Sequence, residues 1–170
     1  SSGAARALCS DKITDPETLA RRIIEEGLNG RELTCAAYFD GKEVKTLPPI
    51  EIVSENSYFD YDAKYNGQVE EITPARLSPE TTSRVKSLTK SIYTILGGNG
   101  IMRVDYIITK SVHEHGILVE NETPTVDVIN LLEINATPGM TPTSFIPQQA
   151  KAGGLEMSYI LDEVIASKLK

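Results

Sequence analysis

The order of apolar and polar positions first predicts a hairpin of two strands. Residues 33–39 are apolar or β-prone, Asp40-Gly41 is a turn signal, and residues 44–53 predict the returning strand. Proline lacks the N–H that a ladder hydrogen bond needs. Pro48-Pro49 therefore predicts that the second strand lies at an edge or contains a bulge.

Three further stretches are typical of helices. A capping box over residues 14–17 opens a short helix that is predicted to stop near Gly27. Ser78-Pro79-Glu80 opens a longer helix that ends at Gly97-Gly98, and a third helix closes the chain. The apolar positions at helical spacing in these last two helices are Val85, Leu88, Ile92 and Ile95, then Leu155, Tyr159, Ile160, Val164 and Ile165.

Strands alternate with polar segments in the rest of the chain. Residues 101–108 and 126–135 predict two strands rich in Ile, Leu and Val, with a polar excursion over 110–125 between them. Residues 54–67 carry four aromatics with little periodicity, which is typical of a long loop that acts as a lid. A Thr/Pro/Gly loop covers 136–144. Central strands with packed helices indicate an α+β or a mixed α/β fold.

Composition narrows the class of protein. The 170 residues are 40% hydrophobic and 24% charged, which argues against intrinsic disorder, and no apolar run is long enough for a membrane span or a signal peptide. A net charge of −7 disfavours nucleic-acid binding and means that an anionic substrate needs local cations. Cys9 and Cys35 form no disulfide framework, so a cytoplasmic location is expected. No membrane partner is expected, because the chain lacks a long apolar run.

Charged and amide side chains interrupt both of the later apolar strands. Arg103 and Asp105 are two residues apart, as are Glu133 and Asn135, so each pair points to one face of its strand. Buried charges require a partner or a metal ion. The oxygens of Asp105, Glu133 and Asn135 suit Mg²⁺. An internal salt bridge of Arg103 with Asp105 or Glu133 explains the pattern equally well.

The motifs together resemble the C-terminal half of the D-alanine–D-alanine ligase family of the ATP-grasp superfamily. The matching stretches run in the family's order and cover most of residues 23–165. The most specific combination is R-x-D, then L-L-E-x-N-x-x-P-G-M-T, then S-x-x-P. All the stretches that match the family are IIEEGLNGRELT (23–34), LPPIEIV (47–53), YFDYDAKY (58–65), EEITPARLS (70–78), MRVDYII (102–108) and LLEINATPGMTPTSFIPQQAKAGG (131–154).

The resemblance implies an α+β ATP-grasp C-terminal domain. Its sheet would be mostly antiparallel with packed helices, joined to the edge of the central ATP-grasp subdomain. Residues 1–30 would be the remnant of that subdomain and residues 31–170 the catalytic domain, with the N-terminal substrate domain absent. The family's upstream phosphate lysines are absent as well, so these 170 residues alone are expected to be inactive.

The resemblance also implies a nucleotide site and a metal site. Glu25 would bind the adenine amino group, the backbone from Glu26 to Leu28 the ring edge, and Glu32 the ribose hydroxyls. Lys64 in the lid would reach the γ-phosphate. The implied cofactors are ATP and two Mg²⁺ ions, with Mn²⁺ as a substitute. The implied metal ligands are Asp105, Glu133 and Asn135.

The implied reaction joins two D-alanines through an acyl phosphate for peptidoglycan precursor synthesis. Arg103 and the Gly139 N–H would stabilise the tetrahedral intermediate. Ser144, with the Phe145 backbone, would hold the carboxylate of the second D-alanine, and Tyr65 would close over the acceptor site. ATP and D-alanine are the implied partners, and the full-length protein would be a homodimer.

Two alternatives to this activity remain open at the level of sequence. A D-alanine–D-lactate or D-alanine–D-serine ligase has the same architecture. The pair Lys64-Tyr65 favours the dipeptide ligase, since ester-forming relatives commonly change the lid residue at Tyr65. A nucleotide-binding module without catalysis is the other alternative, and the presence of all three implied metal ligands argues against it.

Overall fold

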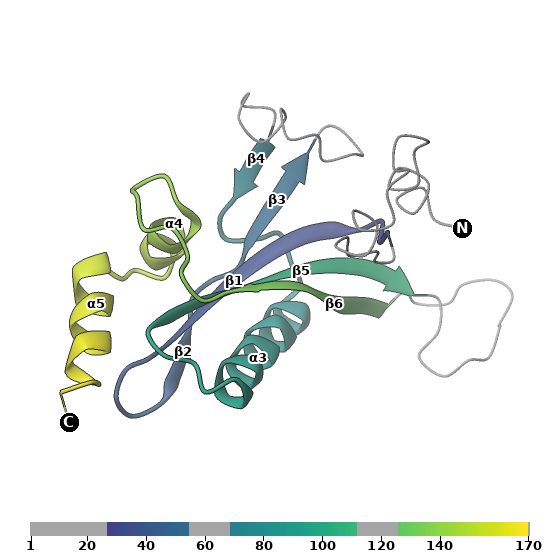
Figure 1. Ribbon diagram of the computed structural model, residues 1–170. Coiled ribbons are helices and arrows are strands. Elements are labelled where there is room, and N and C mark those ends of the chain that lie inside the picture. The colour runs from purple at the N-terminus through teal and green to yellow at the C-terminus, as the bar shows by residue number, and fades with distance from the viewer. Residues whose placement is uncertain (1–26, 55–68, 112–125, 170) are drawn as a thin grey trace, which may run out of the picture.

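Among the residues that the structure describes, a six-stranded antiparallel sheet forms the centre, and three helices pack against it (Figure 1). The computed structural model describes residues 27–54, 69–111 and 126–169. The strand order is β4-β3-β1-β5-β6, with β2 also paired to β1. The strands are β1 Arg31–Phe39, β2 Val44–Thr46, β3 Ile50–Ser54, β4 Val69–Ile72, β5 Ile101–Ser111 and β6 Val126–Asn135. The predicted α+β class is confirmed.

The predicted hairpin is present, and its return strand is divided in two. β2 pairs with the end of β1 through Ala37 and Thr46, whereas β3 pairs with its start through Glu32 and Ile52. Pro48-Pro49 lies between the two pieces, as expected of residues that cannot donate to the ladder. The four-residue strand β4 is too short and polar for its periodicity to indicate it, and it was missed.

Alternate residues of β1 and β5 face two separate cores. Leu33, Cys35 and Ala37 of β1 lie in the cluster that includes Val85 of α3 (Pro79–Ile95). On the opposite face, Ala36 and Tyr38 lie in the cluster completed by α4 (Phe145–Ala152) and α5 (Met157–Ala166). Because side chains alternate between the two faces of a strand, each strand contributes residues to both cores. The site described below lies on the face that α4 and α5 cover.

Helix α3 begins and ends where the sequence predicts. The Ser78 hydroxyl accepts a hydrogen bond from the Thr81 N–H at 3.0 Å, which satisfies one of the unpaired donors of the first turn. Gly97 follows the helix with a φ of 61°, a conformation that favours glycine. Val85 is buried as expected, but Ile95, the last residue of the helix, is 81% exposed.

The pattern of apolar positions predicted one of the last two helices and missed the other. α5 was predicted, yet only Ile160 of its apolar positions is fully buried, and Tyr159 and Ile165 are more than half exposed. α4 was missed, because it has only eight residues, contains Pro147 and follows a Thr/Pro/Gly loop. The helix forms despite this weak local signal because Ile146 and Ala150 are buried against the sheet.

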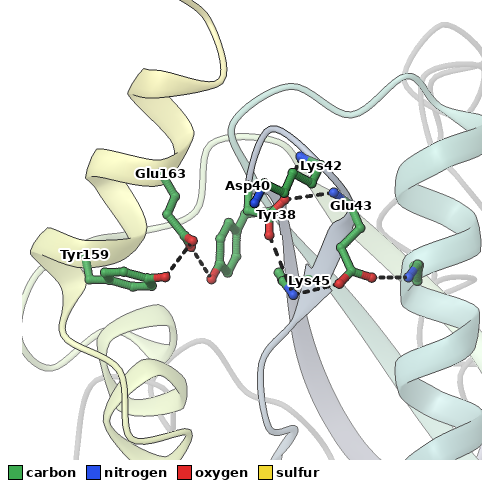
Figure 2. Close-up of polar contacts among 8 residues, drawn as sticks. Tyr38, Asp40, Lys42, Glu43, Lys45, Tyr159 and Glu163 are labelled. Atoms are coloured by element: carbon green, nitrogen blue, oxygen red, sulfur yellow. Dashed lines mark hydrogen bonds and ion pairs between the residues drawn. The ribbon is translucent and has the colours of Figure 1, made fainter.

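Polar contacts join α5 to the β1–β2 hairpin. Figure 2 shows Glu163 accepting hydrogen bonds from two tyrosines, Tyr38 of β1 at 2.9 Å and Tyr159 of α5 at 2.7 Å. Burial, followed by the hydrogen bond to Glu163, raises the pKa of Tyr38, so its hydroxyl stays a donor. In the turn, Asp40 accepts from two backbone N–H groups, those of Lys42 and Glu43, both at 2.8 Å.

A buried carboxylate joins β3 to the segment before α3. Glu51 accepts from Arg31 at 2.9 Å and from Arg76 at 3.1 Å, and its side chain is only 4% exposed. Burial by itself raises the pKa of Glu51, but the hydrogen bonds from Arg31 and Arg76 outweigh it and lower this pKa to about 2.

The Glu51→Gln variant is expected to lose about 1–3 kcal/mol of unfolding free energy at pH 7. The folded-state pKa lies below the unfolded value, so the wild-type advantage is complete above about pH 5 and is lost as the pH falls towards 2. Urea unfolding at pH 7 and pH 3 measures this. Glu43→Gln, which removes an exposed carboxylate paired with Lys45 and Lys90, is the control and should change stability little. If Glu51→Gln lowers the unfolding free energy by the same amount at pH 7 and at pH 3, the lowered pKa of Glu51 is contradicted.

Several expectations lie outside the described residues. These are the helix after Thr14, the lid over 54–67 apart from Ser54, and most of the excursion over 110–125. Within the described residues, no helix is long and apolar enough to cross a membrane.

Candidate active site

The pairing of β5 with β6 brings the two polar pairs of the sequence together. Arg103 lies opposite Asn135, and Asp105 lies opposite Glu133, two positions apart in the antiparallel register. Directly paired residues point to the same face, with Cβ atoms about 4.5–5.5 Å apart. All four side chains therefore lie on one face of the sheet, as the i, i+2 pattern predicts.

Arg103 makes the salt bridge that the sequence allowed as an alternative. Its Nε and Nη2 donate to Asp105 at 2.9 and 2.7 Å, and Nη2 lies 3.5 Å from Glu133 Oε1. The guanidinium also lies 5.3 Å from the ring centroid of Phe145, so a cation–π contact joins β5 to helix α4. The salt bridge and a polar site are thus compatible, since both use the same face.

A bulge in β6 separates the site from the rest of the strand. Asp105 pairs with Glu133 and Tyr106 with Leu131, so Leu132 is the extra residue. The bulge keeps Glu133 and Asn135 facing Arg103 while Ile129, further along, packs against the core on the other face. Asn135 Oδ1 then accepts from the Thr137 N–H at 3.0 Å, which starts the loop to α4.

A small cavity adjoins Arg103 where the β6–α4 loop crosses the sheet. It has a volume of about 160 Å³. A side chain at Gly139 would place its Cβ 2.8 Å from Ser144 Oγ, so glycine lets the loop approach the N-cap residue of α4 without displacing that hydroxyl. Thr141 Oγ1 lies 2.7 Å from Ser144 Oγ, which orients that hydroxyl. The lining residues are Glu71, Arg103, Gly139, Thr143, Ser144 and Phe145.

Two more glutamates lie on the same face of the sheet. The register Ile107–Glu32–Ile52–Glu71 crosses four strands, and Ile107 shares the face of Asp105. Glu32 was expected there from the resemblance, whereas Glu71 was not singled out. The register of the short strand β4 assigns Glu71 to this face, and the sequence holds no clear signal for it.

The electrostatics of the site favour cationic ligands. Three carboxylates, those of Glu71, Asp105 and Glu133, lie around the single guanidinium of Arg103. The described residues contain no group of three or more His, Cys, Asp or Glu side chains with metal-binding geometry. Two carboxylates and the amide of Asn135 nevertheless fit Mg²⁺, which commonly takes one or two protein carboxylates and completes its shell with phosphates and water.

The structure describes only part of the expected nucleotide site. Leu28 is half-buried just before β1. The four expected residues outside the described part are Glu25, Glu26, Lys64 and Tyr65. The adenine hinge and the lid residues therefore stay predictions.

Sequence comparison supports the resemblance drawn from the motifs. The model of the D-ala D-ala ligase C-terminus family matches residues 16–166. A D-alanine–D-alanine ligase from Bacteroides fragilis is 50% identical over 146 residues, covering 86% of this chain and 40% of that protein. One from Porphyromonas gingivalis is 50% identical over 147 residues, with the same coverage of both chains. The chain thus spans about 40% of the length of these relatives.

Solved structures show the same fold. A D-alanine–D-alanine ligase from Bacillus anthracis, complexed with ATP, superposes with a TM-score of 0.58 at 32% identity, covering 85% of this chain and 41% of that one. A D-Ala:D-Ser ligase from Enterococcus faecalis gives 0.62 at 31% identity, covering 84% and 37%. The fold is that of an ATP-grasp ligase. The chain belongs to the D-ala D-ala ligase C-terminus family.

Proposed function

We propose that this chain is the C-terminal catalytic part of a cytoplasmic enzyme that uses ATP to join two D-alanines for peptidoglycan precursor synthesis. The observation that carries the proposal is the register that sets Arg103 beside Asp105, Glu133 and Asn135, next to the cavity at Ser144. Identities of about 50% to D-alanine–D-alanine ligases support the same assignment.

The reaction has two steps. The carboxylate of the first D-alanine attacks the γ-phosphorus of ATP, which forms an acyl phosphate and releases ADP. The amine of the second D-alanine then attacks the acyl carbon, loses a proton as the C–N bond forms, and phosphate leaves. Both steps develop negative charge on oxygen, and positioning together with charge neutralisation provides most of the catalysis in phosphoryl transfer.

Residues of this chain have distinct parts in those steps. The Arg103 guanidinium, oriented by Asp105, faces the developing oxyanion, with the Gly139 N–H as a second donor. Ser144 at the N-terminus of α4 holds the acceptor carboxylate, where the helix favours an anion. Asp105, Glu133 and Asn135 would hold Mg²⁺ or Mn²⁺, which neutralises charge on the phosphate oxygens when bound. Lys64 and Tyr65 are proposed to close the lid, and the whole enzyme is proposed to be a homodimer.

A D-alanine–D-serine ligase is the second candidate. The D-Ala:D-Ser ligase from Enterococcus faecalis superposes with a TM-score of 0.62, close to the value for the Bacillus anthracis ligase. The fold around the site therefore serves both acceptors among the relatives, and the substrate must be assigned by assay.

Phosphate release from ATP tests the function. A version of the chain extended upstream to the length of its relatives is expected to release phosphate in the presence of D-alanine and form the dipeptide. The 170 residues alone are expected to release none, because holding both substrates in reacting geometry can account for about 7–11 kcal/mol of the barrier.

Two outcomes of that assay have opposite meanings. Absence of D-alanine-dependent turnover in the extended protein overturns the proposed function. Turnover by the short chain near the rate of the extended one shows instead that the essential groups were assigned to the wrong part of the protein. D-Serine and D-lactate in parallel reactions identify the acceptor.

A further inference from the structure

We propose that Glu71 binds the ammonium group of the amino-acid acceptor and thereby selects amino acids over hydroxy acids. This inference rests on the proposed function, because it places the acceptor in the cavity between Arg103 and Ser144. Among the residues that the structure describes, Glu71 is the one acidic side chain that lines that cavity. It is contributed by β4, on the side of the sheet farthest from the paired strands β5 and β6.

The size of the cavity fits a small amino acid. A water molecule occupies about 30 Å³ in the liquid, so the cavity of about 160 Å³ has room for roughly five groups of that size. Alanine has about that number of non-hydrogen atoms. The cavity therefore suits a molecule whose carboxylate and amine are separated by one carbon.

The polar groups of the cavity are divided by charge in the way that a zwitterion needs. At one side are the Ser144 hydroxyl and the start of α4, both of which favour a carboxylate. At the other is the Glu71 carboxylate, which favours an ammonium. A hydroxy acid carries no positive charge to offer Glu71, so it forfeits this second interaction.

Glu71 is held in place by helix α4, whose N-cap residue Ser144 is proposed to hold the acceptor carboxylate. Gln148 of α4 donates through Nε2 to Glu71 Oε2 at 2.5 Å and to the Thr143 carbonyl at 3.1 Å. No further partner of the other oxygen, Oε1, is found among the described residues. The carboxylate is thus fixed at the cavity wall with an acceptor atom available to a ligand.

The neighbouring residue offers a matched control. Glu70 is exposed and pairs with Val53, so it points to the opposite face from Glu71, which pairs with Ile52. Glu70→Gln and Glu71→Gln remove the same charge one residue apart. Glutamine at position 71 can still accept from Gln148, which preserves the local fold.

Titrations of the 170-residue chain with D-alanine, D-lactate and propionate, followed by amide chemical shifts, test the proposal. The wild type is expected to bind D-alanine about three- to tenfold more tightly than D-lactate, with shifts centred on residues 139–145. Glu71→Gln is expected to weaken D-alanine binding to the level of D-lactate and leave propionate unchanged. Glu70→Gln should behave as wild type.

The outcomes separate this proposal from the proposed function. Equal D-alanine affinity in wild type and Glu71→Gln, equal wild-type affinity for D-alanine and D-lactate, or no binding of either overturns the role of Glu71. A parallel titration with Mg²⁺ and ATP tests the nucleotide site independently. Retained nucleotide binding in all three proteins, with no effect of Glu71→Gln on D-alanine, refutes the Glu71 assignment while the ligase proposal stands.

Discussion

Asp105→Asn is expected to weaken Mg²⁺-dependent ATP binding by at least about tenfold. The carboxylate of Asp105 lies opposite Glu133, where the metal is proposed, and it also orients Arg103 through three hydrogen bonds. Asparagine has nearly the same shape but loses the negative charge and one acceptor oxygen. The variant therefore removes charge from the metal site while keeping the packing.

Calorimetric titration of the 170-residue chain with ATP, with and without Mg²⁺, measures this effect. Asp127→Asn is the matched control, because Asp127 is also paired, with Lys110 at 2.6 Å, but lies at the far end of β6 from Asn135. Wild-type affinity in Asp105→Asn, or an equal loss in Asp127→Asn, removes Asp105 from the metal site.

Tyr106→Ala is expected to cost about 3–5 kcal/mol of unfolding free energy. The ring of Tyr106 is fully buried between β5 and α3, and its hydroxyl lies 2.8 Å from Thr89 Oγ1. Removing it leaves a large cavity in the core beneath the strand that carries Arg103 and Asp105. Against a typical total of about 5–15 kcal/mol, the loss takes much of the chain's stability.

Tyr106→Phe separates packing from hydrogen bonding. It keeps the ring and loses only the contact with Thr89, so about 0.5–1.5 kcal/mol is expected. Urea unfolding of both variants gives the comparison. Equal losses in the two variants would show that the hydroxyl, rather than the ring, stabilises this part of the core.

Local signals account for the elements that the sequence predicted correctly. The cap at Ser78, the glycine at 97 and the turn at Asp40 act through contacts within a few residues, so the sequence alone is enough to place them. The strands over 101–108 and 126–135 were equally clear from their apolar runs. Short β4 and the eight-residue α4 were missed, because their formation depends on packing against distant residues.

The candidate site divides in the same way. The i, i+2 spacing predicted that Arg103 and Asp105 share a face, and the family motifs suggested roles for Glu133, Asn135 and Ser144. Neither the spacing nor the motifs predicted that Glu71 lies at the site. Its position depends on pairing with Ile52, which is nineteen residues earlier in the chain. The lid and hinge residues lie outside the described part, so their roles stay predictions.

The sequence by itself determined the family of this protein, most of its strands and helices, and the residue types that its chemistry needs. The reason is that caps, turns and periodicity are local, and a motif records residue identity. The tertiary structure decided which side chains meet. Cross-strand register and the burial of α4 against the sheet bring together Arg103, Glu133, Ser144 and Glu71, and long-range packing alone sets those distances.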